Sequence, residues 1–547
     1  MQDYPLTVQH ILWRLERLFP VKEIVTRREE GVHRYTYPDM ARRIHRLAGA
    51  LRRLDVQPGD RVATLAWNNY RHLELYYAIP CMGAVLHTLN LRLFADQLEF
   101  TIRDAGDSVL FVDRTLLPIL DQVAGRIPSV RAIVVMNDGD GAPLPAHNLG
   151  ETLDYEGLLQ AESETFAWPR LEEDTAAAMC YTSGTTGNPK GVVYSHRSQF
   201  LHAMAVLQKD ALGVGEADVV LPVVPMFHAN SWGLPYACGM AGSKLLFPDR
   251  FMGDAQVVLD LAEAEGATIL GGVPTIWINM LGLLEKSGRR LPRVHTVICG
   301  GSAIPRALME GMDRIGLRML HAWGMTETSP IGTVGLLRSW VPAEDQLDSR
   351  IRQGVPAPGV EIRIADLATG EELPWDGVAF GEIQCRGPWI ASGYHNNADP
   401  GRMTADGWFR TGDVATMDPV GCVTIVDRTK DVIKSGGEWI SSVELEGTIM
   451  AHPKVREAAV VGLPHSRWQE RPVAFIVPQP EFEGQVTDAE IRAFLADKVA
   501  KWWLPDEIRF IAEIPKTSTL KFDKKAIRAA ADPIREEEAA GAEVPTA

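Results

Sequence analysis

Hydrophobic residues in the first three quarters of the chain follow two alternating patterns. Short aliphatic runs, such as RVATLAW at 61–67, SVLFVD at 108–113 and RAIVVM at 131–136, predict buried β-strands. Between such runs lie longer periodic stretches, such as 70–85, which predict helices. Strands that alternate with helices are typical of parallel sheets covered by helices. The pattern therefore predicts a large α/β domain built in several layers.

The pattern changes near residue 427. The stretch DRTKDVIKSGGEWIS at 427–441 is polar and contains glycines, which indicates a linker. Beyond it, VREAAVVG, PVAFIV and IRFIAEI predict strands, and TDAEIRAFLADKVAKW predicts a helix between them. We expect an N-terminal domain over 1–426, a hinge over 427–432 and a small α+β domain over 433–547. The acidic tail at 535–547 is predicted to be disordered.

Composition narrows the range of partners. The chain has 547 residues, too many for one ordinary core, and its 55 basic and 71 acidic residues give a net charge of -16. Because no Lys/Arg-rich block offsets that charge, nucleic acid and anionic membrane surfaces are poor partners. No segment approaches the ~20 apolar residues of a membrane span, and the first residues predict an amphipathic helix, not a signal peptide. Any contact with lipid would be peripheral.

The cysteines indicate a reducing compartment. They are Cys81, Cys180, Cys238, Cys299, Cys385 and Cys422, with no CxxC pair among them. Such wide spacing fits neither a zinc site nor a small disulfide scaffold. We therefore expect a cytoplasmic protein.

The sharpest local signal is the loop YTSGTTGNPKG at 181–191. Small residues let the backbone approach an oxyanion, hydroxyl groups donate hydrogen bonds, and Lys190 adds positive charge, so the loop suits a polyphosphate. It departs from the Walker pattern, because five residues separate Gly184 from Lys190 and a glycine follows the lysine. A flexible surface loop would have a similar composition. The residues predicted to meet phosphate are Thr182, Ser183, Gly184, Thr185, Thr186, Gly187 and Lys190.

Further segments follow this loop along the chain. They include VPMFHANSWG at 224–233, GGSA at 300–303, HAWGMTETSP at 321–330, DGWFRTGDVA at 406–415 and PKTSTLKFDKKAIR at 515–528. In this order they resemble the adenylate-forming superfamily of acyl-CoA synthetases, nonribosomal adenylation domains and beetle luciferases, over nearly the whole chain. SGGEWISS, WQERP at 468–472 and AKWWLPD at 500–506 are similar to bacterial medium- and long-chain fatty acyl-CoA synthetases and methylmercaptopropionate–CoA ligases. The resemblance implies a large N-terminal α/β domain and a small C-terminal domain that moves.

The resemblance also implies a nucleotide site that extends beyond the loop. Glu327 would hold Mg2+ against the triphosphate together with the Thr182 hydroxyl, and both are hard oxygen ligands. Trp323 stands where the family usually has tyrosine beside the adenine, so stacking would survive while the phenol hydroxyl would be lost. Asp413 would accept both ribose hydroxyls. The further ATP or AMP contacts implied are Gly301, Ser302, Ala322, Gly324, Met325, Thr326, Arg428, Lys430 and Lys434.

The acid and CoA have implied sites of their own. His228 would position the incoming carboxylate and would not act as a general base, because a carboxylate is already ionised near neutral pH. Trp232 matches a gate residue of long-chain enzymes. The implied acyl pocket is His228, Ala229, Asn230, Trp232 and Gly301, and the implied CoA path is Gly436, Gly437, Glu438 and Trp439. A core tryptophan, a structural histidine and a hairpin turn are the ordinary alternatives.

Lysines near the end of the chain carry the remaining implied roles. Lys521, in PKTSTLK, matches the lysine that bridges carboxylate and ATP during adenylation, and Lys430 matches the hinge position. Lys434 matches a second lysine thought to touch the nucleotide or the acyl group, although solvated lysines would look the same. Leu520 departs from the glycine usual in relatives and would be strained by ~1 kcal/mol or more if the site needs φ above zero. The implied catalytic set is Lys521, Lys190, His228, Glu327 and Lys434.

These features predict an ATP-dependent acid–CoA ligase with Mg2+ as cofactor. A carboxylic acid and ATP would give an acyl-adenylate and pyrophosphate, and CoA would then give acyl-CoA and AMP. Medium- or long-chain fatty acids are the expected substrates, with methylmercaptopropionate and other short or aryl acids left open. A carrier-protein ligase is disfavoured because no carrier domain follows, and a non-catalytic nucleotide sensor because Glu327 and Lys521 are retained. Relatives are often homodimers, which implies a homodimer here.

Overall fold

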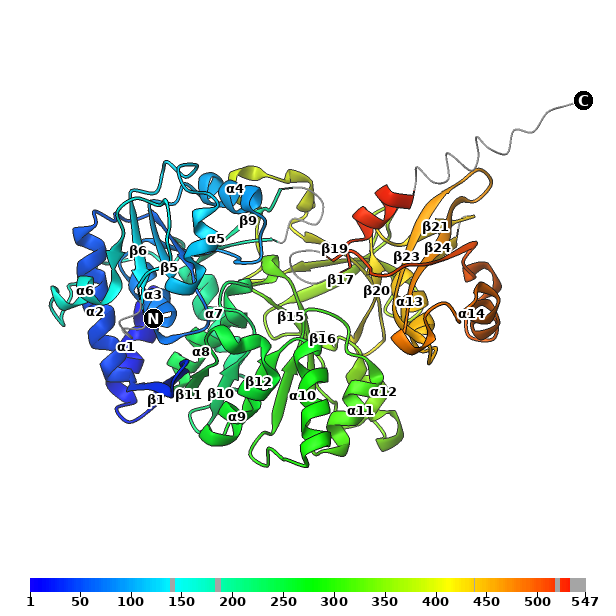
Figure 1. Cartoon of the computed structure of the whole chain (residues 1–547), viewed down its shortest axis with the longest axis horizontal. Coiled ribbons are helices and arrows are strands. Elements are labelled where there is room, and N and C mark those ends of the chain that lie inside the picture. The colour runs from blue at the N-terminus through cyan, green and yellow to red at the C-terminus, as the bar shows by residue number, and fades with distance from the viewer. Residues whose placement is uncertain (138–142, 183–187, 437, 517–521, 532–547) are drawn as a thin grey trace, which may run out of the picture.

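The computed structural model describes residues 1–137, 143–182, 188–436, 438–516 and 522–531. Its elements run from the N-terminal region at one side of Figure 1 to the C-terminal sheet at the other. The helices are α1 Val8–Leu18, α2 Tyr37–Arg53, α3 Tyr70–Cys81, α4 Ala95–Ala105, α5 Leu117–Asp121, α6 Tyr155–Gln160, α7 His196–Leu207, α8 Leu234–Ala241, α9 Ala255–Glu265, α10 Pro274–Ser287, α11 Arg306–Arg314, α12 Gln346–Ile351, α13 Ser442–Met450 and α14 Asp488–Leu495. In the described ranges, no helix is long and apolar enough to cross a membrane.

Within the described residues, the first sheet has seven strands in the order β7-β6-β5-β3-β4-β8-β9. They are β3 Arg61–Leu65, β4 Val85–Thr88, β5 Val109–Asp113, β6 Ala132–Met136, β7 Leu153–Asp154, β8 Ala176–Tyr181 and β9 Gly191–Ser195. All neighbours pair in parallel except β8 and β9, which form an antiparallel pair. The strands and helix expected over 61–136 are therefore confirmed.

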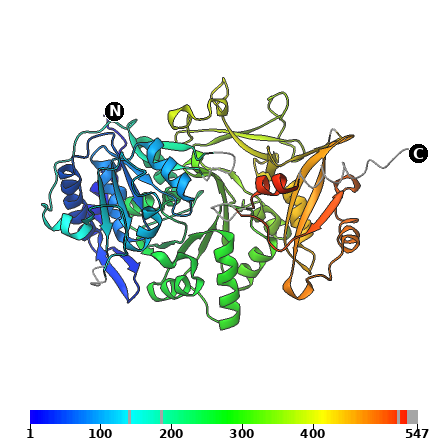
Figure 2. The same ribbon diagram turned by 45° about the horizontal axis from the view of Figure 1, so that its top comes forward.

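A second sheet lies beside the first, with helices on its faces (Figure 2). In the part of the chain that is described it has nine strands, ordered β16-β15-β14-β13-β12-β10-β11-β1-β2. They are β1 Glu23–Arg27, β2 Val32–Thr36, β10 Val219–Pro222, β11 Lys244–Phe247, β12 Ile269–Gly272, β13 Thr296–Cys299, β14 Met319–Gly324, β15 Ile331–Val334 and β16 Val355–Pro356. The strands from β14 to β1 pair in parallel, while β2, β15 and β16 add antiparallel edges.

Two smaller antiparallel systems follow. One contains β17 Glu361–Ala365, β18 Phe380–Arg386, β19 Phe409–Met417 and β20 Val423–Arg428. The other contains β21 Ile433–Ser435, β22 Glu438–Ile440, β23 Val455–His465 and β24 Gln469–Pro478, with β25 Glu507–Phe510 parallel to β24. Residues 429–432 join the two systems, and separate apolar clusters cover the faces of β23 and β24. The domain limits and the hinge stay predictions.

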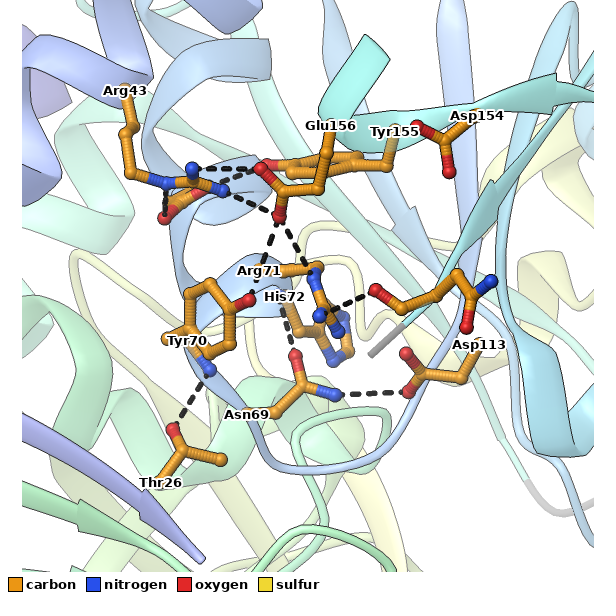
Figure 3. A network of polar contacts seen from close by, with 12 residues as sticks. Thr26, Arg43, Asn69, Tyr70, Arg71, His72, Asp113, Asp154, Tyr155 and Glu156 are labelled. Carbon is orange, nitrogen blue, oxygen red and sulfur yellow. Dashed lines mark hydrogen bonds and ion pairs between the residues drawn. The ribbon is translucent and has the colours of Figure 1, made fainter. Parts of the chain in front are cut away.

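A network of buried and half-buried charged residues connects α2, α3 and α6 (Figure 3). Arg43 on α2 donates to Glu156 through both terminal nitrogens, at 2.8 and 2.9 Å. Its Nε donates at 2.7 Å to Glu74, a fully buried carboxylate on α3 that also accepts from the Tyr155 hydroxyl at 2.6 Å. Removing Arg43 would leave the fully buried Glu74 carboxylate without its ion pair, which costs about 3–5 kcal/mol for a buried pair. The network therefore fixes α2, α3 and α6 to one another.

Candidate functional site

The predicted phosphate loop joins the antiparallel strands β8 and β9, and its two ends are bonded together. The Thr182 amide donates to the Lys190 carbonyl at 2.9 Å, and the Lys190 amide donates to the Thr182 hydroxyl at 3.1 Å. Gly191 follows, and a Cβ there would lie 2.4 Å from Met179 and 3.0 Å from the Tyr181 ring. Glycine therefore suits the close strand packing after the lysine, since a larger residue would require Met179 and the Tyr181 ring to shift. Ser183, Gly184, Thr185, Thr186 and Gly187 lie outside the described residues.

A cavity of about 180 Å³ opens beside the ends of this loop. It lies where residues that follow parallel strands gather, which is the usual place for ligands of open α/β sheets. The residues that line it are Thr182, Asn188, Lys190, Leu212, His228, Ala229, Trp232, Val273, Ile298, Gly300, Gly301, Ala322, Trp323, Gly324, Met325, Thr326, Glu327, Pro330, Ile331, Tyr394, Arg402, Thr411 and Arg428. Charged groups and aliphatic side chains thus face one space.

Lys190 has defined partners on the connection between β18 and β19. Its Nζ lies 2.5 Å from Oδ2 of Asp399, which also accepts from Nε of Arg402 at 3.1 Å. The same ammonium lies 5.2 Å from the centre of the Tyr394 ring, within the range of a cation–π contact. Because of its bonds to the two cations, the pKa of Asp399 is lowered, although partial burial acts against them.

Glu327 is a buried carboxylate, 5% exposed, in the short turn that follows β14. Burial raises its pKa, while the hydrogen bond it accepts from the Tyr394 hydroxyl opposes that shift. A buried carboxylate gains stability from a nearby cation, because an opposite charge favours its ionised form. Glu327 and Thr182 offer a carboxylate and a hydroxyl to the same cavity, and this donor set fits Mg2+, which takes its remaining ligands from phosphate and water.

Asp413 on β19 is buried, and both of its carboxylate oxygens contact residues that line the cavity. The Trp323 indole donates to Oδ2 at 2.8 Å, and Nε of Arg428 lies 2.5 Å from Oδ1. One face of the Trp323 ring packs on Gly332, where a Cβ would lie 2.3 Å from the ring. Tryptophan at this position therefore keeps an aromatic surface in the cavity and adds a donor to Asp413.

The segment after β10 brings His228, Ala229 and Trp232 to the cavity through a left-handed turn. Ala229, Asn230, Ser231 and Trp232 have φ of 35°, 40°, 55° and 58°. Residues with side chains visit this region at a cost of about 1–2 kcal/mol each, so the packing around the turn must hold it. The Thr88 hydroxyl donates to the Asn230 side chain at 3.1 Å, which keeps that side chain off the cavity lining.

Many of the residues implied by the sequence do lie together here. Thr182, Lys190, His228, Ala229, Trp232, Gly301, Ala322, Trp323, Gly324, Met325, Thr326, Glu327 and Arg428 all line the cavity. Among the described residues, Ser302, Asn230, Asp413, Lys430, Lys434, Gly436 and Trp439 do not line it. Gly437, Leu520, Lys521 and the Glu438 side chain fall outside the described part, so their roles stay predictions.

Two described residues of the predicted CoA path, Gly436 and Trp439, lie in the hairpin of β21 and β22 in the C-terminal sheet. Lys434 pairs in register with Trp439 across β21 and β22, and its Nζ lies 5.2 Å from the Trp439 ring. Gly436 has φ of 64° and faces Trp468, whose ring a Cβ would approach to 2.7 Å. Glycine is therefore needed at 436 for backbone conformation and for the tryptophan contact.

Four polar lining residues were not predicted from the sequence: Asn188, Tyr394, Arg402 and Thr411. Tyr394 and Arg402 come from the polar stretch YHNNADPGR at 394–402, which has the composition of an ordinary turn. The sequence feature that could have identified them is the presence of a tyrosine and an arginine in this turn, since both side chains commonly bind charged groups. Their partners Glu327 and Asp399 could not be assigned, because long-range pairing does not follow from sequence spacing.

Comparison with protein families matches residues 14–395 to the AMP-binding enzymes and residues 444–521 to the C-terminal domain of AMP-binding enzymes. The chain is 45% identical over 535 residues to a long-chain-fatty-acid–CoA ligase of Thermus thermophilus, covering 96% of each chain. It is 42% identical to a 3-methylmercaptopropionyl-CoA ligase of Ruegeria lacuscaerulensis, covering 96% of this chain and 98% of that one. It is 41% identical to a medium-chain-fatty-acid–CoA ligase of Ectopseudomonas oleovorans, covering 96% of each.

Solved structures share the fold over nearly the full length. The anthranilate CoA ligase AuaEII in complex with anthranoyl-AMP superposes with a TM-score of 0.84 at 25% identity, covering 98% of this chain and 100% of that one. ATP-bound MatB from Rhodopseudomonas palustris gives a TM-score of 0.82 at 26% identity, covering 96% and 99%. The expected α/β architecture with a smaller C-terminal domain is thereby confirmed.

Proposed function

Because this chain belongs to the family of AMP-binding enzymes, we propose that it is an ATP-dependent acid–CoA ligase that forms AMP. The observation that carries the proposal is the mixed character of one cavity. Lys190, Glu327 and Arg402 suit a magnesium polyphosphate, while Leu212, Val273 and Ile298 suit an apolar acyl group. A substrate pair of ATP and a hydrophobic acid would use both surfaces.

In the first step, an oxygen of the acid's carboxylate attacks the α-phosphorus of ATP, and pyrophosphate leaves. Lys190 offsets negative charge on the phosphates. Glu327 and Thr182 would hold Mg2+, which would supply further charge neutralisation. His228 orients the carboxylate, and Trp323 with Asp413 holds the adenosine. Positioning and electrostatics carry this chemistry, because both reactants are already charged and need no proton removed.

In the second step, the thiolate of CoA attacks the acyl carbonyl, and AMP leaves with the oxygen that bridged carbon and phosphorus. We assign Gly436, Gly437, Glu438 and Trp439 to the path of the pantetheine arm and Lys521 to the first step alone. Different groups of the C-terminal domain serve the two steps, so we propose that this domain, residues 433–547, rotates about the segment 427–432, with Lys430 at the pivot and Lys434 near the nucleotide.

The proposed substrates are medium- or long-chain fatty acids, supported by the activities of the Thermus and Ectopseudomonas relatives named above. A second candidate is 3-methylmercaptopropionate, supported by the 42% identity to the Ruegeria enzyme. Rates of acyl-CoA formation with straight-chain acids of increasing length, 3-methylmercaptopropionate and benzoate distinguish these candidates. We expect the ratio of kcat to KM to peak at a medium or long chain, and a peak at the thioether acid would replace that assignment.

The test of the activity itself is product analysis with Mg2+, ATP, CoA and a fatty acid. We expect acyl-CoA, AMP and pyrophosphate in equal amounts. Formation of ADP and phosphate, or no thioester with any acid, would refute the proposal. We also propose that the protein is a cytoplasmic homodimer. Light scattering on the purified protein tests the oligomeric state.

A further inference from the structure

One segment of the chain supplies partners to two charged groups of the proposed phosphate site. Residues 394–402, between β18 and β19, place the Asp399 carboxylate 2.5 Å from Nζ of Lys190. The same segment brings the Tyr394 hydroxyl to Glu327. An acidic side chain at the lysine of a polyphosphate loop occupies a contact that a phosphate oxygen would also make.

The Asp399 carboxylate has a well-defined position, but its ion pairs contribute little to stability. Asp399 Oδ2 accepts from Arg402 as well as Lys190, so one carboxylate bridges two cations. The side chains of Lys190 and Asp399 are 25% and 29% exposed, and ion pairs at such exposure stabilise proteins only slightly. A phosphate, with more charge and more acceptor oxygens, can therefore displace the carboxylate.

The segment is anchored on its other side. His395 Nε2 lies 3.1 Å from the Asp104 carbonyl, and Asn396 donates to the Asp104 side chain at 3.1 Å, at the end of α4. These bonds tie His395 and Asn396 to α4 and do not involve the Asp399 carboxylate. We therefore expect that Asp399 can exchange Lys190 for another partner by a change of rotamer.

We propose that Asp399 is an internal competitor for the phosphates of the nucleotide: it pairs with Lys190 and Arg402, and ATP must displace it to bind. The residue thus sets the affinity for the polyphosphate and keeps both cations paired when they do not contact phosphate. This inference rests on the proposed function, because it assumes that Lys190 meets ATP.

The test is calorimetric binding of MgATP, magnesium pyrophosphate and adenosine to the full chain, without acid or CoA. Asp399→Asn keeps the shape and removes the charge, so MgATP and pyrophosphate should bind about two- to fivefold more tightly. Adenosine, which carries no phosphate, should bind as before. Asp399→Glu retains the charge and should restore affinities near those of the parent.

Asp406→Asn is the matched control. Asp406 lies on the same connection, pairs with Arg363 at 2.8 Å and does not line the cavity. Its variant therefore changes the net charge of the protein as much as Asp399→Asn does, but away from the proposed phosphate site. Unchanged or weaker phosphate binding by Asp399→Asn, or an equal gain in Asp406→Asn, would overturn the inference. A parent protein that binds neither MgATP nor pyrophosphate would contradict the proposed function, and this inference with it.

Discussion

Replacing Trp323 with phenylalanine isolates the hydrogen bond between its indole and Asp413. The change keeps an apolar ring against Gly332 and removes the donor, which lies 2.8 Å from Oδ2 of an Asp413 that is 3% exposed. Hydrogen bonds to charged groups contribute about 1.5–3 kcal/mol. Because Arg428 still holds the other oxygen, we expect the lower value, or roughly tenfold weaker binding of ATP.

Comparing the binding of ATP with that of 2′-deoxy-ATP shows whether the variant has lost a contact with the ribose. If Trp323 orients Asp413 toward the ribose, the variant should discriminate less between ATP and 2′-deoxy-ATP, because the poorly oriented carboxylate gains less from the 2′-hydroxyl. Equilibrium binding of both nucleotides measures this ratio. Trp67→Phe is the control, since it removes an indole bond to Thr115 away from the cavity. Equal loss of both nucleotides, or full retention of both, would refute the positioning role.

Three further predictions concern the acyl channel, the bridging lysine and acid stability. Trp232→Ala should change the ranking of acids by chain length more than the affinity for ATP, and an unchanged ranking in the folded variant would exclude a gate. Lys521→Ala should abolish acyl-AMP formation but spare much of the conversion of supplied acyl-AMP to acyl-CoA; normal adenylation would remove the assignment. Burial lowers the pKa of His72 and His196 to about 4 and the pKa of His202 to about 3. Below about pH 6.5, these histidines therefore bind more protons in the unfolded chain than in the folded protein. The free energy of unfolding should consequently decrease as the pH falls toward 4. Thermal unfolding should show His196→Gln reducing the pH slope by about 1.4 kcal/mol per unit, and an unaltered slope would count against that histidine.

The parallel parts of the fold were predictable because their signals are local. A short, valine-containing apolar run such as Val109–Asp113 is typical of a strand covered on both faces, and the change of composition at 427 precedes a separate sheet. The antiparallel system β17 to β20 was not predicted. Long connections separate β17 from β18 and β18 from β19, so no short hairpin signal marks these pairs.

The site also contains residues that local motifs mark and residues that only long-range contacts reveal. Lys190 and Glu327 lie in distinctive motifs, so both could be named from the sequence as candidate site residues, and both line the cavity. Tyr394 and Asp399 act through partners that are far away in the chain, at 327 and 190, and no local pattern reports such a contact. The left-handed turn at Ala229–Trp232 was hidden as well, because residues with side chains at positive φ are held there by tertiary packing.

The central claim, an acyl-adenylate made and consumed at one site, is tested most directly by following oxygen. Single-turnover reactions would use a fatty acid labelled with 18O in both carboxylate oxygens, together with MgATP and CoA. Attack of the carboxylate on the α-phosphorus followed by thiol attack on the carbonyl leaves one labelled oxygen in AMP and none in pyrophosphate. Mass spectrometry of AMP should therefore show a gain of one 18O per acyl-CoA formed. Unlabelled AMP, or label in inorganic phosphate accompanied by ADP, would contradict the account.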